Sequence, residues 1–404
     1  MRVLQINSIY GAKSTGLIMK DIHHTLLEFG VDSYVAYRDT TDDHVVNGIR
    51  VGNSLDWKLH ALRMRIDGKQ GYSSYFSTKV FINEIECIKP DIIHLHNIHS
   101  NFLNLQLVVN YAKKNRIPIV LTLHDCWYFT GKCYHFVDFG CDRWKTGCGE
   151  CPKRMIDIPS LFCDSSSSVF KERKKLFDYD KLYVIGCSQW ISSLAKQSPI
   201  FENARHSYIY NGVDLDVFTD SNEKSHTDND GIIILVMANK WFEDKNKEIR
   251  DRILVSLKEY DRLIIVGCTN TQKRSLEQKT NVITYGYIKN RAELAKVYSQ
   301  ADVFLNVTHI DNLPTVNMEA LGCGTPVITY NVGGCGELIQ QGKTGYVVPL
   351  DDITTVLSSF DEIRHRKIIR RDCRLYAVEH FNKLDNYMKY LDLYTKIALD
   401  LKEE

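Results

Sequence analysis

The sequence has almost no excess of charge of either sign. Its 51 lysines and arginines are balanced by 50 aspartates and glutamates, which leaves a formal net charge of +1 at pH 7. Proteins that bind nucleic acids rely on clustered positive charge, and no overall field of that kind is present here. The balance argues against a nucleic-acid partner, and any cationic site must come from a local cluster.

Long hydrophobic runs are also missing. No window approaches the roughly 20 apolar residues that a membrane-spanning helix needs. Met1 leads almost directly into an apolar run from Val3 to Ile6, which leaves no room for the regions of a signal peptide. These absences predict a cytoplasmic protein. The 12 cysteines are then expected to be reduced thiols, so a cluster of them points to metal binding more than to disulfides.

Length and patterning predict two α/β domains. A chain of 404 residues is too long for one ordinary core and fits two domains of about 200 residues. Short β-rich runs alternate with helical stretches in both halves, which is typical of parallel sheets. The segment 219–230, TDSNEKSHTDND, has no apolar residue to bury and predicts a linker. We expect domains 1–215 and 216–375 with a cleft between them, and a helical tail 376–404 that could pack back on the first domain.

One segment of the second half combines a helix start with a strand. It spans residues 310–338 and reads IDNLPTVNMEALGCGTPVITYNVGGCGEL. We expect Asp311 and Asn312 to cap a helix that begins around Pro314. Free amides and the helix dipole at such a start form a site for an anion, such as a diphosphate. Glu319 follows one or two turns later, where it could bind the vicinal hydroxyls of a ribose. The alternative is a well-capped helix that binds nothing.

A second candidate anion site follows the expected strand 232–237. The segment 238–245 reads ANKWFEDK and contains Lys240 and Lys245. A fixed cation in such a place can stabilise negative charge on a bound group without a metal. A single lysine such as Lys245 is more often a solvated surface residue, so its assignment depends on the neighbouring motifs.

Together these motifs resemble the hallmark of glycosyltransferase family 4. The pattern is an acidic residue, seven residues, Glu, then Ala-Leu-Gly-Cys-Gly-Thr-Pro-Val and a Gly-Gly-x-x-Glu turn. Here the acidic pair is Asp311 and Glu319, with Asp where the family usually has Glu. The resemblance covers nearly the whole chain. It implies the GT-B architecture, in which two Rossmann-like, doubly wound parallel-sheet domains face a cleft.

The family resemblance also assigns roles within the acidic motif. Glu319 would bind the ribose, and Asp311, which precedes the helix, would face the sugar. The backbone near Asn312 and Leu313 would hold the donor.

Further roles follow for residues around the phosphates and the sugar. Lys245 matches the family's phosphate-facing lysine, and Lys240 is the nearest substitute for an arginine that usually precedes it. In the first domain, Gly16 matches a glycine that faces the donor phosphates, and His124 matches a histidine that meets the donor sugar. Asp125 could orient His124 or the acceptor.

Two other histidines are expected to be structural. His94 and His96 alternate along one strand and therefore lie on the same face of it. Histidines in such positions are more often packed and hydrogen-bonded than catalytic.

The implied activity is that of a retaining hexosyltransferase. It would move a sugar from a UDP- or GDP-sugar to a glycan or lipid-linked oligosaccharide acceptor, in bacterial capsule, exopolysaccharide or O-antigen synthesis. The acceptor hydroxyl would attack from the side of the leaving group, so that neither an enzyme nucleophile nor a catalytic cofactor or metal is needed. Two alternatives stay open: a nucleotide-sugar epimerase on the same architecture, and a non-catalytic glycan-binding scaffold.

A cysteine-rich loop over residues 126–152 has two interpretations. It contains Cys133, Cys141, Cys148 and Cys151, the last two in a Cys-x-x-Cys knuckle. Four thiolates could hold a structural zinc and stiffen the loop. The spacing before the knuckle is irregular and a nearby histidine competes as a ligand, so free thiols in a packed loop fit as well.

A basic amphipathic segment also has two interpretations. Residues 55–69 read LDWKLHALRMRIDGK and place Leu55, Leu59, Leu62 and Ile66 on one helical face, with basic residues around it. Such a helix could lie on the inner face of an anionic membrane, where a lipid-linked acceptor would be met, as a peripheral contact. Alternatively, it packs its apolar face on its own domain.

Overall fold

The computed structural model describes the whole chain except residues 221–230, 366, 367, 369 and 404. Most of the linker expected at 219–230 lies outside the described residues. The side chains of residues 402 and 403 are likewise not described.

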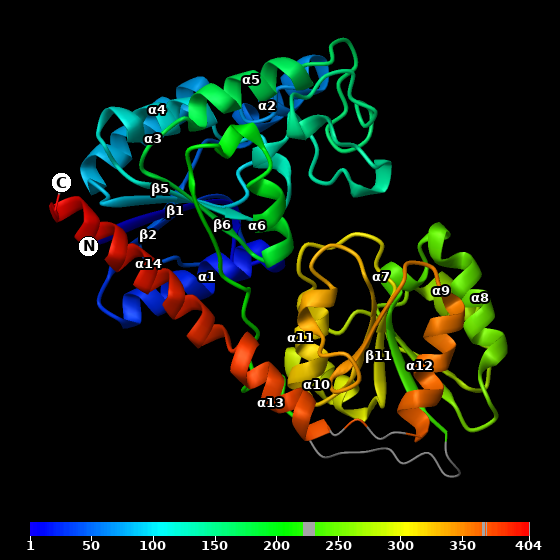
Figure 1. Cartoon of the computed structure of the whole chain (residues 1–404). Helices are drawn as coiled ribbons and strands as arrows, with labels where there is room; N and C mark the ends of the chain where they lie inside the picture. Colours follow the sequence, from blue (N-terminus) through cyan, green and yellow to red (C-terminus); the bar gives the residue numbers. More distant parts are fainter. Residues whose placement is uncertain (221–230, 366–367, 369, 404) are drawn as a thin grey trace. The chain divides into compact units, whose positions relative to one another are not determined.

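The chain divides into two compact units (Figure 1). The first comprises Met1–Tyr210 together with Leu384–Glu404, and the second comprises Asn211–Lys383. The boundary therefore falls a few residues before the position expected from the sequence. Residues 376–383 of the expected tail belong to the second unit, and only the remainder of the tail returns to the first.

The first unit contains a seven-stranded parallel sheet in the order β3-β2-β1-β4-β5-β6-β7. The strands are β1 (Arg2–Tyr10), β2 (Asp32–Thr40), β3 (Gly48–Arg50), β4 (Ile92–Leu95), β5 (Ile119–Leu123), β6 (Leu182–Gly186) and β7 (Arg205–Tyr208). Every residue of β4, β5 and β6 is buried, because both faces of a parallel sheet are covered by its crossover helices. The order reverses between β1 and β4, as in a doubly wound fold.

Helices connect the strands of the first unit, and the last helix of the chain also packs in this unit. The helices are α1 (Lys13–Glu28), α2 (Ser54–Asp67), α3 (Tyr75–Ile88), α4 (Leu105–Lys114), α5 (Ser166–Phe177), α6 (Gln189–Ala195) and α14 (Lys383–Glu403). Tyr387, Tyr390 and Tyr394 of α14 pack in one hydrophobic cluster with Val3 and Ile92 of the sheet. Over the described residues, no helix is long and apolar enough to cross a membrane.

The second unit contains a six-stranded parallel sheet in the order β10-β9-β8-β11-β12-β13. Its strands are β8 (Ile233–Met237), β9 (Arg262–Val266), β10 (Val282–Thr284), β11 (Val303–Asn306), β12 (Val327–Tyr330) and β13 (Gly345–Val348). Its helices are α7 (Ala238–Trp241), the 3-10 turn η5 (Asp244–Asn246), α8 (Lys247–Ser256), α9 (Asn270–Arg274), α10 (Arg291–Gln300), α11 (Thr315–Gly322), α12 (Ile353–His365) and α13 (Arg370–Phe381). Both units therefore have the Rossmann-like α/β fold that the sequence predicts.

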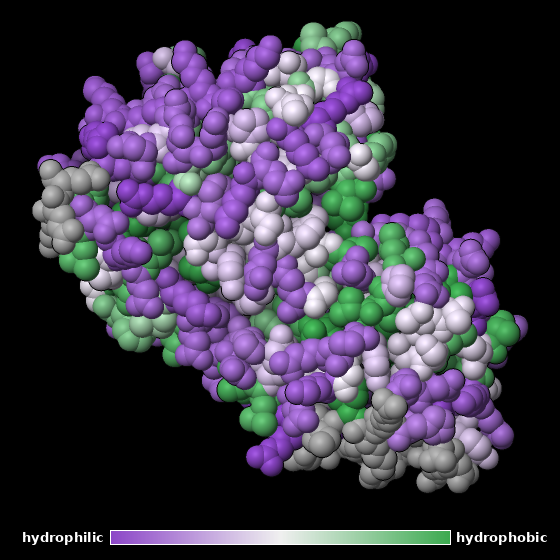
Figure 2. Space-filling view, viewed as in Figure 1, coloured by the Kyte–Doolittle hydropathy of each residue, from purple (hydrophilic) through white to green (hydrophobic). Residues whose placement is uncertain are grey.

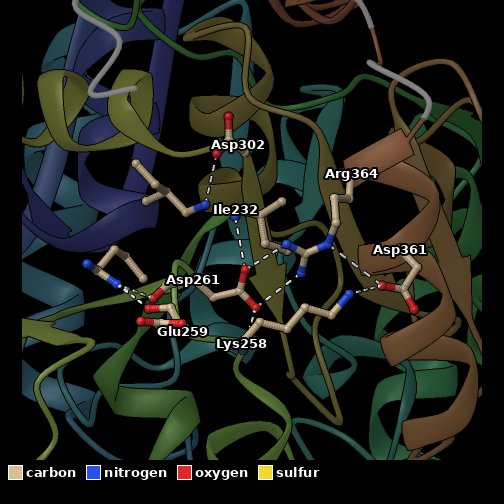
Figure 3. Close-up of polar contacts among 9 residues, drawn as sticks. Ile232, Lys258, Glu259, Asp261, Asp302, Asp361 and Arg364 are labelled. Atoms are coloured by element: carbon tan, nitrogen blue, oxygen red, sulfur yellow. Dashed lines mark hydrogen bonds and ion pairs between the residues drawn. The ribbon is translucent and has the colours of Figure 1, made fainter. Parts of the chain in front are cut away.

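A buried ion pair ties α12 to the start of two strands in the second unit (Figure 3). The carboxylate oxygens of Asp261 accept the backbone amides of Ile232 at 3.1 Å and Lys258 at 2.8 Å. Arg364 of α12 donates to both oxygens, at 2.8 and 3.1 Å. Both side chains are almost completely buried. Burial opposes ionisation of Asp261, but these hydrogen bonds outweigh it and lower its pKa.

Candidate functional site

The second unit has a cavity beyond the carboxyl ends of β8 and β11, where ligands bind in open α/β sheets. Its volume is about 120 Å³. Its lining residues come from the ends of the two strands and from the start of α11: Met237, Asn239, Lys240, Phe304, Leu305, Asn306, Val307, Thr308, Asp311, Pro314, Thr315 and Val316. The cavity thus brings Lys240 and Asp311, which lie far apart in the sequence, to one place.

The start of α11 faces this cavity without a side-chain cap. The helix begins at Thr315, and Pro314 occupies the N-cap position, where it makes no side-chain hydrogen bond. Asp311 instead accepts the amide of Leu313 at 3.1 Å. The expectation that Asp311 and Asn312 cap this helix is therefore wrong for Asp311, which caps the turn before the helix. The first turn is left for other acceptors, as in anion sites at helix starts.

The glycine turn at Gly333 and Gly334 contacts the backbone of Asp311. Gly333 has a φ of +56°, and a Cβ there would lie 1.8 Å from the carbonyl oxygen of Asp311. Gly334 donates its amide to the same oxygen at 3.2 Å. Burial raises the pKa of the Asp311 side chain, although the amide of Leu313 and the charge of Lys240 act in the opposite direction. The expected Gly-Gly turn is thus needed because two backbone segments touch.

Two lysines share one carboxylate beside the cavity. Lys240 Nζ lies 2.8 Å from Glu243 Oε1, and Lys245 Nζ lies 3.1 Å from Glu243 Oε2. Burial disfavours the charged form of Glu243, but the hydrogen bonds from both lysines outweigh it and lower its pKa. Lys240 lines the cavity, whereas Lys245 is not among its described lining residues. The role of Glu243 was not foreseen, although its spacing of three residues from Lys240 is a pattern that could have indicated it.

Asn246 connects the lysine segment to the end of β11. This fully buried side chain donates to the carbonyl oxygens of Lys240 at 2.8 Å and Val307 at 2.9 Å. Its Oδ1 lies 2.8 Å from His309 Nε2, which is also 3.1 Å from Asp351 Oδ1. Burial lowers the pKa of His309, with Asp351 opposing the shift. Neither Asn246 nor His309 was expected from the sequence, because no local motif marks a bond between such distant segments.

Glu319 lies one turn after Thr315 on α11, and therefore on the same face of the helix. Its side chain is 12% exposed. Tyr298 donates its hydroxyl to Glu319 Oε2 at 3.2 Å, and Arg291 Nη2 lies 3.6 Å from Oε1. Burial raises the pKa of Glu319 to about 7, although Arg291 and Tyr298 act in the opposite direction. This carboxyl group can therefore change its charge near neutral pH.

In the first unit, His124 and Asp125 follow β5 but have separate partners. His124 Nε2 lies 3.1 Å from His96 Nδ1. Asp125 Oδ2 lies 2.7 Å from His99 Nε2, and its other oxygen accepts the amide of Trp127 at 2.8 Å. His99 and the Trp127 amide engage the carboxylate, and an orienting role of Asp125 toward His124 or the acceptor stays a prediction. His96 contacts the His124 ring.

Burial favours the neutral form of His94, His96 and His124. Burial lowers the pKa of His124 to about 4, with Asp125 opposing the shift. His94 and His96 are fully buried, with ring centroids 3.9 Å apart. Burial also places the pKa of each well below the usual value of histidine. The prediction that His94 and His96 share a face and are packed is confirmed, and His96 Nε2 lies 3.2 Å from Gln5 Oε1.

Gly16 lies within α1 and has a packing reason to be glycine. The helix begins at Lys13, so Gly16 belongs to its first turn. A Cβ at Gly16 would lie 3.0 Å from both the carbonyl oxygen and Cγ2 of Ile9 on β1. A role toward a donor phosphate stays a prediction.

The four cysteines of the expected zinc loop line one small cavity of the first unit. Its volume is about 20 Å³. Cys133, Cys141, Cys148 and Cys151 are all free thiols, and Gly131 donates its amide to Cys148 Sγ at 3.1 Å. Within the described ranges, however, no three side chains among His, Cys, Asp and Glu are arranged to hold a metal ion. The loop gathers the four thiols as expected, and the structural zinc stays a prediction.

Comparisons with known proteins place this geometry in a family context. Residues 221–380 match the family model described as "Glycosyl transferases group 1". The chain is similar to the "Putative colanic acid biosynthesis glycosyl transferase WcaC" of Escherichia coli strain K12, with 26% identity over 365 residues. That match covers 85% of this chain and 87% of the relative.

Solved structures share the fold of the whole chain. Sucrose-phosphate synthase from Thermosynechococcus elongatus has a TM-score of 0.68 at 15% identity, and the match covers 99% of both chains. Alr3699/HepE from Anabaena, solved in complex with UDP and glucose, has a TM-score of 0.63 at 14% identity, over 98% of this chain and 100% of that one. These similarities confirm the GT-B fold that the motifs predict.

Proposed function

We propose that the chain is a retaining glycosyltransferase that takes its sugar from a UDP- or GDP-sugar, since residues 221–380 match the family model of the group 1 glycosyl transferases. The observation that carries the proposal is the cavity at the start of α11, whose lining includes both Lys240 and Thr315. A cation and a helix start are the two features that stabilise a phosphate without a metal. A UDP complex is known for the Anabaena neighbour.

In this proposal, the diphosphate of the donor occupies the cavity. Lys240 and the first amides of α11 stabilise the negative charge that develops as the bond to the sugar breaks, and Lys245 adds a second cation nearby. Glu319 binds the ribose hydroxyls through its carboxylate. Asp311, on the cavity wall, contacts the sugar. The acceptor hydroxyl attacks from the leaving-group side, which retains the configuration of the sugar.

For the acceptor, we propose a glycan or a lipid-linked glycan of a bacterial surface polysaccharide. The relatives support this class by their names: one is a colanic acid glycosyl transferase, and another is the "Capsular polysaccharide biosynthesis glycosyltransferase CapM" of Staphylococcus aureus, 26% identical over 126 residues. The sugar would then be transferred from donor to acceptor at the cytoplasmic face of a membrane.

A donor screen tests the proposal. Purified protein is incubated with a panel of UDP- and GDP-sugars, with and without extracts of lipid-linked glycans, and release of the nucleoside diphosphate is measured. We expect acceptor-dependent release that persists in EDTA and yields a product of retained anomeric configuration by NMR. Lys240→Ala should abolish release, whereas Lys258→Ala, an exposed lysine of the same unit, should not.

Three results would contradict the proposal. Isomerisation of the donor without an acceptor would indicate an epimerase. Inversion at the anomeric carbon would exclude the retaining mechanism. An absence of binding to any nucleoside diphosphate in a thermal-shift panel would indicate a scaffold.

A further inference from the structure

Helix α2 turns its apolar stripe away from its own domain. The exposed fractions are 66% for Leu55, 57% for Leu59, 57% for Leu62 and 45% for Ile66. The residues that α2 buries lie on its other face: Trp57, His60 and Met64. The expectation that this helix packs its leucine face on its own domain is therefore wrong.

Polar anchors on the buried face explain this orientation. The indole of Trp57 donates to the carbonyl oxygen of Val51 at 3.1 Å. His60 Nδ1 lies 2.8 Å from Ser74 Oγ, and its Nε2 accepts the amide of Gly71 at 3.2 Å. Turning the leucines inward would break these buried hydrogen bonds, and each unsatisfied group would be costly. The rotation of the helix is thus set by its polar contacts, and the leucines remain outside.

A neighbouring loop extends the apolar surface. Leu161 donates its amide to the carbonyl oxygen of Arg65 at 2.8 Å, which places the loop against the end of α2. Leu161 and Phe162 are 53% and 74% exposed. Figure 2 shows hydrophobic side chains at the edge of the first unit where Figure 1 shows the loops between β5 and α5. We call these six residues the α2 face: Leu55, Leu59, Leu62, Ile66, Leu161 and Phe162.

The fully exposed charges of α2 are all basic. The exposed charged residues of the helix are Lys58, Arg63 and Arg65. Its two carboxylates, Asp56 and Asp67, are only partly exposed, and Asp67 pairs with Arg63 at 3.4 Å. An exposed apolar stripe edged by basic residues is the pattern of helices that lie in the plane of an anionic bilayer.

A second copy of the chain fits this surface less well. In a two-fold dimer each face meets itself, so the basic edges of the two helices would be brought together. Such juxtaposition of like charges is unfavourable at a protein interface. Lipid phosphates supply the opposite charge instead.

We propose that the α2 face binds the surface of an anionic phospholipid bilayer, with its leucines in the interface and Lys58 and Arg65 against lipid phosphates. This inference is independent of the donor site, because it concerns residues of the first unit alone. It specifies a surface contact through one helix and one loop.

Vesicle flotation of the full chain tests the inference. Vesicles of phosphatidylcholine, with or without phosphatidylglycerol, are mixed with the protein and floated on a density gradient. We expect binding to the anionic vesicles, weakened by added salt, and a loss of about tenfold or more in the double variant Leu59→Gln/Leu62→Gln. Lys58→Gln/Arg65→Gln should lose the preference for phosphatidylglycerol.

Matched controls distinguish specific membrane binding from misfolding and from non-specific hydrophobic binding. Val255 on α8 is 84% exposed, and Val255→Gln should bind vesicles as the wild type does. Each variant should keep the wild-type melting temperature, because the substituted side chains are exposed. Equal flotation of the leucine variant, or no flotation of the wild type, would overturn the inference. So would a dimer that Leu59→Gln/Leu62→Gln dissociates while vesicle binding is absent.

Discussion

The hydroxyl of Tyr298 lies 3.2 Å from one carboxylate oxygen of Glu319, while Arg291 approaches the other at 3.6 Å. Both neighbours favour the charged form of Glu319, yet burial dominates and raises the pKa to about 7. Neither Tyr298 nor Arg291 belongs to the motif that marks Glu319 in the sequence. The charge of Glu319, the proposed ligand of the ribose, is thus set mainly by burial, which two residues of α10, a helix outside the motif, partly oppose.

Nucleotide affinity should depend on the charge of Glu319. The carboxylate accepts hydrogen bonds from a ribose diol better than the protonated acid does, so the Kd for UDP or GDP should fall as the pH rises through about 7. Calorimetric titration between pH 5.5 and 8.5, roughly 1.5 units on either side of that pKa, measures this dependence. In Glu319→Gln the Kd should be higher and nearly independent of pH. Glu293→Gln, an exposed glutamate on α10, should behave like the wild type; an unchanged pH dependence in Glu319→Gln would contradict the assignment.

The two lysines should differ in importance. Only Lys240 lines the cavity, so Lys240→Ala should lower kcat/KM by about 100-fold or more, as for loss of a group that stabilises developing charge. Lys245 is 42% exposed and lies five residues after Lys240, so the loss of kcat/KM in Lys245→Ala should be about tenfold smaller. Glu243→Gln should raise the KM for the donor, because it frees both lysines. Equal losses for the two lysine variants would show that the cavity alone does not define the phosphate site.

His124 should remain neutral over the physiological range. Its pKa is about 4, because burial disfavours the charged ring. A depressed histidine pKa means that the unfolded chain binds the proton first as the pH falls below about 6.5, so this group destabilises the fold at acidic pH. Ring signals in NMR spectra, assigned with His124→Asn, should show no protonation between pH 8 and about 5. A midpoint near 6.5 would mean that the ring is solvated, contrary to the structure.

The ion pair of Asp261 and Arg364 should be a main determinant of stability in the second unit. Asp261→Asn leaves a buried guanidinium without its carboxylate partner and should lower the free energy of unfolding by about 3–5 kcal/mol. The pKa of Asp261 is lowered in the fold, so the contribution is present above the unfolded pKa of about 3.9 and is lost as the pH falls below it. Urea denaturation at pH 7 and at acidic pH measures both effects.

An exposed pair in the same unit is the control for this ion pair. Lys258 and Asp361 lie 3.3 Å apart, but both side chains are more than half exposed. Lys258→Ala should therefore cost less than about 1 kcal/mol. A similar loss for Lys258→Ala and Asp261→Asn would show that burial does not distinguish the two pairs.

The sequence alone predicted the fold and several candidate site residues, because these predictions follow from local pattern. Alternation of strands and helices predicted two parallel sheets, and the spacing of Asp311, Glu319 and the following glycines marked the start of α11. The family resemblance favoured Lys245 as the phosphate-facing lysine and gave Lys240 only as the nearest substitute for an arginine. Interactions between neighbours along the chain fix such features, so no knowledge of distant contacts was needed.

Only the tertiary structure decided which groups touch. The partners of Glu319, the pairing of Asp125 with His99, and the return of α14 to the first sheet join residues that are distant in the sequence. The orientation of α2 was decided in the same way: its pattern predicts two faces, but buried bonds of Trp57 and His60 determined which face is covered. The free energies of burial and hydrogen bonding depend on which groups are in contact in three dimensions. The pattern of residues along the chain does not specify these contacts.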